Sequence, residues 1–270
     1  IQLMAEIKKV LVLTPSLDGK VSTEYVSSLV GLKSRLFENK INCSALFHIG
    51  NSILFSARNH LMQDFIESNA DAALLVDADI TYQPTDVVAA LKVLGDGIIG
   101  FPCSRKFPQW SRAISFVRDN PEFPVEKITS ILGDANFGIE SDTVQPDEHG
   151  LIDVPWIGTG AMLVSRAAVQ KIMDYDPAAV YFGEKKKRLL YKFFNYRFDE
   201  ESLTYSGEDV GFCMLAKEAG VSLKAKIDAK TGHVGFIDMY FDALAVSDLS
   251  KYSKKPSPET QSEDTRTSTS

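Results

Sequence analysis

Short apolar runs and helical patterns alternate along the first hundred residues of the chain. The runs are rich in β-branched and aliphatic residues, which predicts strands over residues 8–15, 42–49, 71–80 and 97–102. Between them, apolar residues recur every three or four positions, as on one face of a helix. Strands that alternate with helices imply crossover connections. We therefore predict an α/β fold with a mostly parallel central sheet of Rossmann-like type.

Residues typical of helix ends frame the helical stretches. A serine just outside a helix can accept a hydrogen bond from a backbone N–H of the first turn, and proline suits the first turn itself. Helix starts are predicted at Ser22, Ser52, Pro84, Ser165 and Ser206. Gly220 is predicted to end the last helix, because glycine adopts the left-handed conformation that often follows a helix.

The pattern changes after Phe101. Residues 102–150 are rich in Pro, Gly, Asp and Asn and have no long period, which predicts irregular loops and short antiparallel strands in a smaller appended region. Strand character returns at 154–166 and 221–227. We expect one domain over residues 1–246, with halves at about 8–101 and 102–246.

A polar tail is predicted at the end of the chain. From about Ser247 it consists mainly of Ser, Thr, Lys and Glu without apolar periodicity. Such a segment cannot bury enough apolar surface to fold, so residues 247–270 are predicted to be disordered and removable.

Composition narrows the functional classes. The 270 residues are 44% hydrophobic and 24% charged, with a net charge of −7, which argues against bulk binding of nucleic acid or anionic membranes. No apolar run approaches the roughly 20 residues of a membrane span, and no secretory signal is visible. The three cysteines are scattered, without a CxxC pair, which is typical of a reducing compartment. A cytoplasmic location is therefore expected.

Two carboxylates stand at the end of a predicted buried strand, in LLVDADITYQP. Ligands of open α/β sheets bind at the carboxyl ends of strands, where Asp77 and Asp79 would lie. Their mutual repulsion predicts a cation, and carboxylate oxygens suit Mg²⁺ or Mn²⁺. Without metal, removing Asp79 should then be neutral or stabilising. The alternative is a turn in which Asp79 caps the next helix.

Several motifs, in this order, resemble nucleotide-sugar glycosyltransferases with the A-type fold. LLVDADITYQP is similar to their DXD motif, SGEDVGFCMLAKEAG to the acidic helix start of family 2 and TGHVG to a C-terminal metal-binding histidine. IGFPCSRK and WIGTGAMLVSR are similar to the strand and loop on the acceptor side. ARN and DADI are also similar to mannosyltransferases of the Anp1 type. The resemblance covers roughly residues 8–236.

The resemblance implies a metal site. Asp79 would ligate Mn²⁺ or Mg²⁺ directly, His233 would be the other protein ligand, and Asp77 would touch the ribose or the metal through water. The metal would bridge the two phosphates of the donor. Taken alone, His233 reads as a loop histidine with a local hydrogen bond.

The resemblance also implies a donor site. Thr14 and Pro15 would lie against the base and ribose, although they also read as a simple strand stop. Arg58 lies among apolar residues and needs a partner, either a phosphate or the DXD carboxylates, unless it reaches the surface. Gly158 and Gly160 would let backbone N–H groups approach the donor. Asn59, Lys106 and Trp156 are further candidates, the last for stacking on a sugar or for the core.

Glu208 and Asp209 begin a predicted helix. By resemblance, Asp209 would be the base that deprotonates the acceptor hydroxyl, and Glu208 would bind the acceptor. The alternative is structural, because Ser206 with an acid three residues later is close to a capping box.

The predicted function is a metal-dependent, inverting transfer of sugar from a nucleotide-sugar donor to a glycan, lipid-linked or protein acceptor. One alternative is a phosphatase of the haloacid dehalogenase type, with Asp77 as nucleophile. However, two strand–helix units precede the motif, and Ile80 stands where glycine is usual. Another alternative is a non-catalytic nucleotide- or sugar-binding module.

Overall fold

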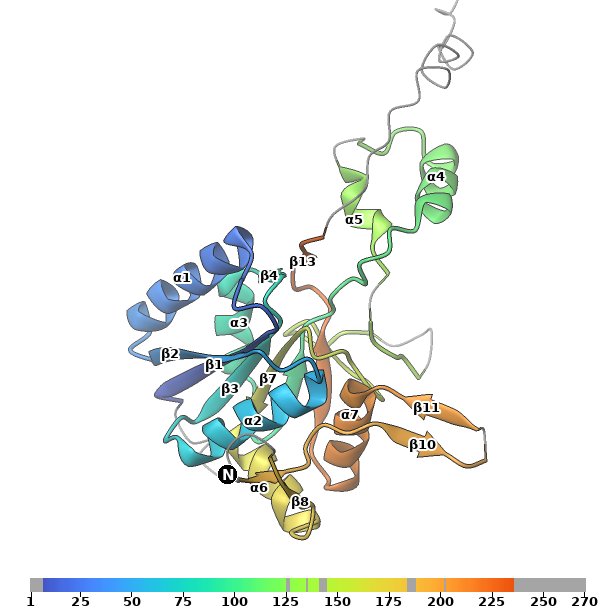
Figure 1. The fold of residues 1–270 in the computed structure, drawn as a ribbon. Helices are drawn as coiled ribbons and strands as arrows, with labels where there is room; N and C mark the ends of the chain where they lie inside the picture. The colour runs from blue at the N-terminus through green and yellow to red at the C-terminus, as the bar shows by residue number, and fades with distance from the viewer. Residues whose placement is uncertain are drawn as a thin grey trace, which may run out of the picture. The chain divides into compact units, whose positions relative to one another are not determined.

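The computed structural model describes residues 7–124, 127–134, 136–140, 145–183, 188–201 and 203–235 (Figure 1). The chain divides into two units, residues 1–235 and 236–270, and every described residue belongs to the first. The predicted tail, 247–270, and the end of the predicted domain, 236–246, lie outside the described residues.

A seven-stranded sheet forms the centre of the first unit, with the strand order β2-β1-β3-β7-β5-β12-β6. Its strands are β1 (Lys9–Ser16), β2 (Asn42–Ile49), β3 (Ala72–Val76), β5 (Ile98–Gly100), β6 (Leu151–Asp153), β7 (Ala161–Ser165) and β12 (Leu223–Lys226). β2, β1, β3, β5 and β12 run in one direction, and β7 and β6 run against them. The predicted α/β class with a mostly parallel sheet is confirmed.

Three two-stranded antiparallel sheets accompany the central sheet. They are β4 (Ile80–Tyr82) with β13 (Thr231–His233), β8 (Val180–Phe182) with β9 (Leu189–Tyr191), and β10 (Arg197–Asp199) with β11 (Thr204–Ser206). The helices are α1 (Thr23–Glu38), α2 (Leu54–Glu67), α3 (Pro84–Leu91), α4 (Trp110–Asp119), α5 (Thr129–Leu132), α6 (Arg166–Tyr175) and α7 (Glu208–Glu218).

The segment after Phe101 differs from its prediction. Its described residues up to 150 contain α4 and α5 and no named strand, so the expectation of short antiparallel strands there is wrong. Trp110, Ala113, Ile114 and Val117 do follow a helical period, but the prolines and glycines around them obscure it in the sequence.

Two of the four predicted serine caps are confirmed. Ser22 and Ser165 each accept a hydrogen bond from the first turn of the following helix, at 3.0 Å from Tyr25 N and Ala168 N respectively. Ser52 and Ser206 do not cap: the N-caps of α2 and α7 are Ile53 and Gly207, without a side-chain cap bond. Ser206 instead ends β11, where strand pairing fixes its backbone.

The other predicted helix ends are confirmed. Pro84 is the first residue of α3, and Gly220 follows the C-cap of α7 with a φ of 71°. That angle lies in the left-handed region that glycine tolerates without strain.

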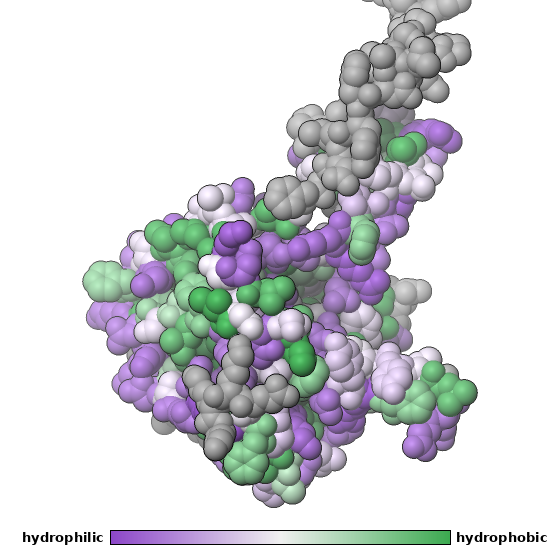
Figure 2. All heavy atoms as spheres, viewed as in Figure 1, coloured by the Kyte–Doolittle hydropathy of each residue, from purple (hydrophilic) through white to green (hydrophobic). Residues whose placement is uncertain are grey.

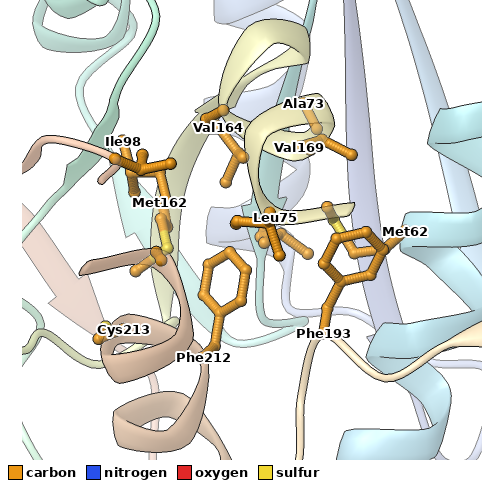
Figure 3. Packing of buried hydrophobic residues seen from close by; sticks show 14 of the residues in the cluster. Met62, Ala73, Leu75, Ile98, Met162, Val164, Val169, Phe193, Phe212 and Cys213 are labelled. Carbon is orange, nitrogen blue, oxygen red and sulfur yellow. The ribbon is translucent and has the colours of Figure 1, made fainter. Parts of the chain in front are cut away.

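The sheet buries apolar side chains on both faces. Leu75 points to one cluster, where it meets residues of α2, α6 and α7, and neighbouring Leu74 points to the other, against α1 and α3. Figure 3 shows Leu75 among Phe212, Met62 and Phe193. Alternation of side chains along a buried strand produces this division.

Close backbone contacts position two segments: the start of α7, which carries Glu208 and Asp209, and β13, which carries His233. At Gly211 in α7, a Cβ atom would stand 2.1 Å from the backbone oxygen of Asn195, so glycine lets the start of the helix approach the segment between β9 and β10. β13 pairs with β4 so that His233 lies opposite Ile80, and Val234 N donates to Asp79 O at 2.8 Å. Segments that are about 150 residues apart in the chain therefore meet just after β3.

Candidate functional site

A pocket of about 220 Å³ lies at the carboxyl end of β3. It is lined by seven of the residues predicted from the sequence: Arg58, Asp77, Gly158, Gly160, Glu208, Asp209 and His233. Asp79 lies behind the lining, in contact with His233, whereas Thr14 and Pro15 are outside it. Other parts of the lining come from the loop after β5 and from the segment before β7.

Arg58 forms ion pairs with two acids that are far apart in the chain, Asp77 and Glu208. Its Nη2 donates to both oxygens of Asp77, at 2.9 and 3.1 Å, and its Nη1 donates to Glu208 Oε1 at 2.8 Å. The guanidinium lies over the ring of Phe194, 5.7 Å from its centroid. The Arg58 side chain is only 3% exposed, so the surface reading is wrong and the predicted carboxylate partner is confirmed.

Asp79 has cations of its own. Lys106 Nζ contacts Asp79 Oδ2, and His233 Nε2 lies 3.3 Å from Asp79 Oδ1. Burial raises the pKa of Asp79, but hydrogen bonds from His233 and Lys106 outweigh burial and bring it from 3.8 to about 2. Each of the two carboxylates therefore has separate cationic partners, which offset their mutual repulsion in the metal-free protein.

The ring of His233 is oriented by a backbone carbonyl. Its Nδ1 lies 2.7 Å from Ser104 O, and because a carbonyl only accepts hydrogen bonds, this nitrogen carries a proton. In the neutral ring, the Nε2 lone pair then faces the Asp79 carboxylate. A proton or a metal ion between these two atoms would remove the repulsion between the lone pair and the carboxylate. The hydrogen bond to Asp79 raises the pKa of His233, while burial lowers it less strongly.

The three predicted metal-site residues are not equivalent. Asp79 and His233 lie side by side, while Asp77 gives both oxygens to Arg58. Within the part of the chain that the structure describes, no group of three or more His, Cys, Asp and Glu is arranged to hold a metal ion. The protein thus offers a pair of adjacent ligand atoms at this point.

The two acids at the start of α7 have different partners. Glu208 is bound to the buried Arg58, whereas Asp209 Oδ2 accepts a hydrogen bond of 3.3 Å from the neutral amide of Asn136. Asp209 Oδ1 accepts from Val210 N at 2.8 Å. Of the two, Asp209 is therefore the carboxylate whose hydrogen bonds come from neutral groups of the described residues.

The loop before β7 supplies a buried hydroxyl. Thr159 is 2% exposed, lines the pocket, and its Oγ1 has no hydrogen-bond partner among the described residues. Such a group usually implies a missing polar ligand or water. Neighbouring Gly158 already donates its N–H to Asn136 O at 2.8 Å, so this group is not free for a donor as predicted.

Thr159 and Asn136 were not predicted as site residues. Thr159 stands between Gly158 and Gly160, which were predicted for the donor site, and this position could have indicated it as a site residue. Asn136 lies in the irregular region, and no pattern singles it out.

Other residues predicted for the site make their contacts outside the pocket. The hydroxyl of Thr14 is buried and lies 2.5 Å from that of Tyr25, and Pro15 is buried within β1. Asn59 binds both backbone polar groups of Phe194, at 2.8 and 3.0 Å. Trp156 is partly buried against the core cluster, as in the structural alternative.

Cys103 lines the pocket but is not suited to act as a nucleophile. Burial raises the pKa of its thiol to about 12. At neutral pH the reactive thiolate is therefore almost absent.

No protein-family model matches the chain, and no curated protein matches it in sequence. Solved structures similar to it include the following three. A197 from STIV is 17% identical, with a TM-score of 0.45 over 85% of this chain and 86% of that one. A Drosophila beta-1,4-galactosyltransferase 7 with manganese, UDP-Gal and xylobiose is 11% identical, with a TM-score of 0.41 over 90% and 80%. GalNAc-T7 with UDP, GalNAc and Mn²⁺ is 8% identical, with a TM-score of 0.44 over 86% and 44%.

At these TM-scores, the likeness does not assign an activity to this chain, so the side chains of the pocket are the basis for one.

No helix in the described ranges combines the length and apolar character needed to cross a bilayer.

Proposed function

We propose that this protein is a metal-dependent glycosyltransferase that moves a sugar from a nucleotide-sugar donor to an acceptor hydroxyl with inversion. The observation that carries the proposal is the facing pair of Asp79 Oδ1 and His233 Nε2, 3.3 Å apart at the end of β3. Two acceptor atoms held this close favour a cation between them. The acids of α7 lie in the pocket next to them.

The residues present suit Mn²⁺ or Mg²⁺. Asp79 supplies a carboxylate oxygen, which these ions prefer, and His233 an imidazole nitrogen whose opposite N–H is held by Ser104. Two protein ligands leave positions for donor phosphates and water, as is common for such ions. When bound, the metal would neutralise the leaving nucleoside diphosphate.

Cationic and neutral polar groups around the pocket would bind the donor. Arg105 lines the pocket, and Lys106 follows it and contacts Asp79, so both can reach a pyrophosphate. The unpartnered hydroxyl of Thr159 can donate to a phosphate or sugar oxygen. We assign Asp77 to the ribose, or to the metal through water. The backbone at Thr14 and Pro15 remains our proposal for the base and ribose floor.

Asp209 is proposed to remove the proton of the acceptor hydroxyl. At the same time, the hydroxyl oxygen attacks the anomeric carbon of the donor sugar, and the bond from this carbon to the diphosphate breaks. A base must have a carboxylate that is not already neutralised, and Asp209 is bound by a neutral amide, whereas Glu208 is bound to Arg58. Glu208 is accordingly assigned to binding and orientation. Attack opposite the leaving group produces inversion.

The phosphatase alternative is disfavoured by Arg58. An aspartyl nucleophile needs an available oxygen, but both oxygens of Asp77 accept hydrogen bonds from the same guanidinium group.

Thermal shift with Mn²⁺ and a panel of UDP, GDP, CMP and dTDP sugars tests the proposal. A ligand that binds only the folded chain raises the melting temperature. We expect one donor class to do so, His233→Ala to weaken the shift, and added Mn²⁺ to restore part of it. Asp209→Asn should keep the shift and lose about 100-fold in turnover.

Asp153→Asn is the matched control, because Asp153 is highly exposed and outside the pocket. Binding without turnover on a broad acceptor panel would instead identify a non-catalytic module. Hydrolysis of a simple phosphate ester that vanished in Asp77→Asn would identify a phosphatase.

A further inference from the structure

The β10–β11 hairpin presents two aromatic rings on one face. Phe198 and Tyr205 are cross-strand partners, with ring centroids 4.7 Å apart and planes at 43°. Their exposed fractions are 47% and 76%. Figure 1 shows the hairpin projecting beside α7, and in Figure 2 it carries apolar surface next to hydrophilic surface. Exposed paired rings are costly in water and indicate a binding surface.

The hairpin is anchored to the helix that carries the proposed base. Arg197 forms a two-point ion pair with Glu218 of α7, including an Nη2 to Oε2 contact of 2.8 Å. At the other strand, β11 ends at Ser206 and α7 begins at Glu208. Tyr205 therefore precedes the pocket acids by only a few residues of ordered backbone.

We propose that this aromatic pair, Phe198 and Tyr205, is a binding platform for a saccharide acceptor. This inference rests on the proposed function and narrows its acceptor from glycan, lipid-linked or protein to a glycan. The C–H face of a sugar ring stacks on the apolar face of an aromatic ring, and the Tyr205 hydroxyl can bond to the sugar hydroxyls. A saccharide bound to this platform would lie near the start of α7, because Tyr205 precedes Glu208 by three residues.

Charge and size favour a saccharide over other occupants. Glu200 and Glu201 are exposed at the turn of the hairpin, and the chain has a net charge of −7, so an anionic lipid surface would be repelled. The two strands have three residues each, which offers little edge for pairing with a second copy. A tilted aromatic pair next to a turn with two exposed carboxylates offers ring faces for the C–H groups of a sugar and acceptors for its hydroxyls.

Saturation-transfer NMR with a panel of methyl α- and β-glycosides tests the platform directly. We expect at least one glycoside to bind the wild type, and Phe198→Ser and Tyr205→Ser to weaken that binding about tenfold. Tyr205→Trp should retain it, because the larger ring keeps the stacking face. Phe37→Ser is the matched control, since Phe37 is an exposed aromatic residue at the end of α1.

Transfer kinetics add a second readout. With a saccharide acceptor, the two serine variants should raise the acceptor KM about tenfold and change kcat little. Binding of the nucleotide sugar in the presence of Mn²⁺ and without acceptor, measured as a thermal shift, reports on the proposed function alone. Its absence, together with hairpin-dependent saccharide binding, would reject the transferase and keep the sugar site.

The inference is overturned if no glycoside binds the wild type, or if all variants bind equally well. It is also overturned if the wild type transfers sugar to peptide or lipid acceptors only.

Discussion

Asp77 and Asp79 are two residues apart in the chain, yet they bind different cations. Asp77 belongs to the buried network of Arg58 and Glu208, and Asp79 belongs to the half-exposed group of His233 and Lys106. This separation gives the two acids different roles: one is fixed by a guanidinium group, and the other faces an imidazole nitrogen. A metal ion would have to compete with a proton only at Asp79, which faces the imidazole nitrogen of His233.

Removing Arg58 should destabilise the fold strongly. Arg58→Met leaves two carboxylates in a site where the guanidinium is 3% exposed, and breaking a buried ion pair costs about 3–5 kcal/mol. Urea unfolding measures the change. Arg35→Met is the control: Arg35 is exposed and pairs with Glu38, so we expect a loss below about 0.5 kcal/mol. Equal effects of the two substitutions would contradict the buried network.

The contact between Asp79 and His233 should make stability depend on pH. The pKa of Asp79 is lowered to about 2, so its contribution is present above pH 3.8 and is lost as the pH falls towards 2. The pKa of His233 is raised above 6.5, so its contribution is complete below pH 6.5 and is lost as the pH rises through the raised value. Both contributions coexist between pH 3.8 and 6.5.

In the presence of a chelator, Asp79→Asn should therefore be less stable than wild type at about pH 5, by up to about 1 kcal/mol. The difference should be smaller at about pH 8.5, because the pKa of His233 is raised and its contribution is lost as the pH rises through that pKa. Urea unfolding at the two pH values measures it. A variant as stable as wild type at the lower pH would restore the expectation of mutual repulsion.

Among the elements, α7 begins without a side-chain cap. Gly207, not a serine, is its N-cap, so Glu208 and Asp209 occupy the first turn with side chains directed to the pocket. Acids there also interact favourably with the helix dipole. Phe212 stacks on Phe194 on the buried side, with ring centroids 4.5 Å apart. The helix is thus held by its packing rather than by a side-chain cap.

Ser22 and Ser52 both precede a helix, but replacing each by alanine should change the stability of the protein by different amounts. Ser22→Ala removes a cap bond to Tyr25 N and should cost about 1 kcal/mol. Ser52→Ala should change stability by less than about 0.5 kcal/mol, because the N-cap of α2 is Ile53. The midpoints of urea unfolding compare them. A similar cost at both positions would mean that Ser52 caps α2 in solution.

At the scale of the whole molecule, the central sheet separates two apolar clusters and brings distant segments to one edge. Leu74 and Leu75 are both buried, on opposite faces of β3. The pocket lies at the end of this doubly covered strand, so the stability of both clusters supports the geometry of the site. The unfolding of the two clusters should be a single transition for the same reason.

Leu74→Ala and Leu75→Ala should each destabilise the protein by about 2–5 kcal/mol. Each removes a side chain from a different cluster, but both should lower the midpoint of one cooperative transition. Calorimetry detects whether one or two transitions occur. Leu17→Ala is the control, because Leu17 is 64% exposed and should cost little. Two separate transitions in either variant would show that the clusters unfold independently.

The sequence by itself determined the α/β class, the acid pair at a strand end, two serine caps and the glycine stop of α7, because local period and chemistry encode them. Only the tertiary structure decided which cation meets which acid. Arg58 and Glu208 are 150 residues apart, and His233 reaches Asp79 through the pairing of β13 with β4. It also showed that the hydroxyl of Thr14 is bonded in the core while that of Thr159 is unpartnered. Long-range packing sets these contacts, and no local pattern carries them.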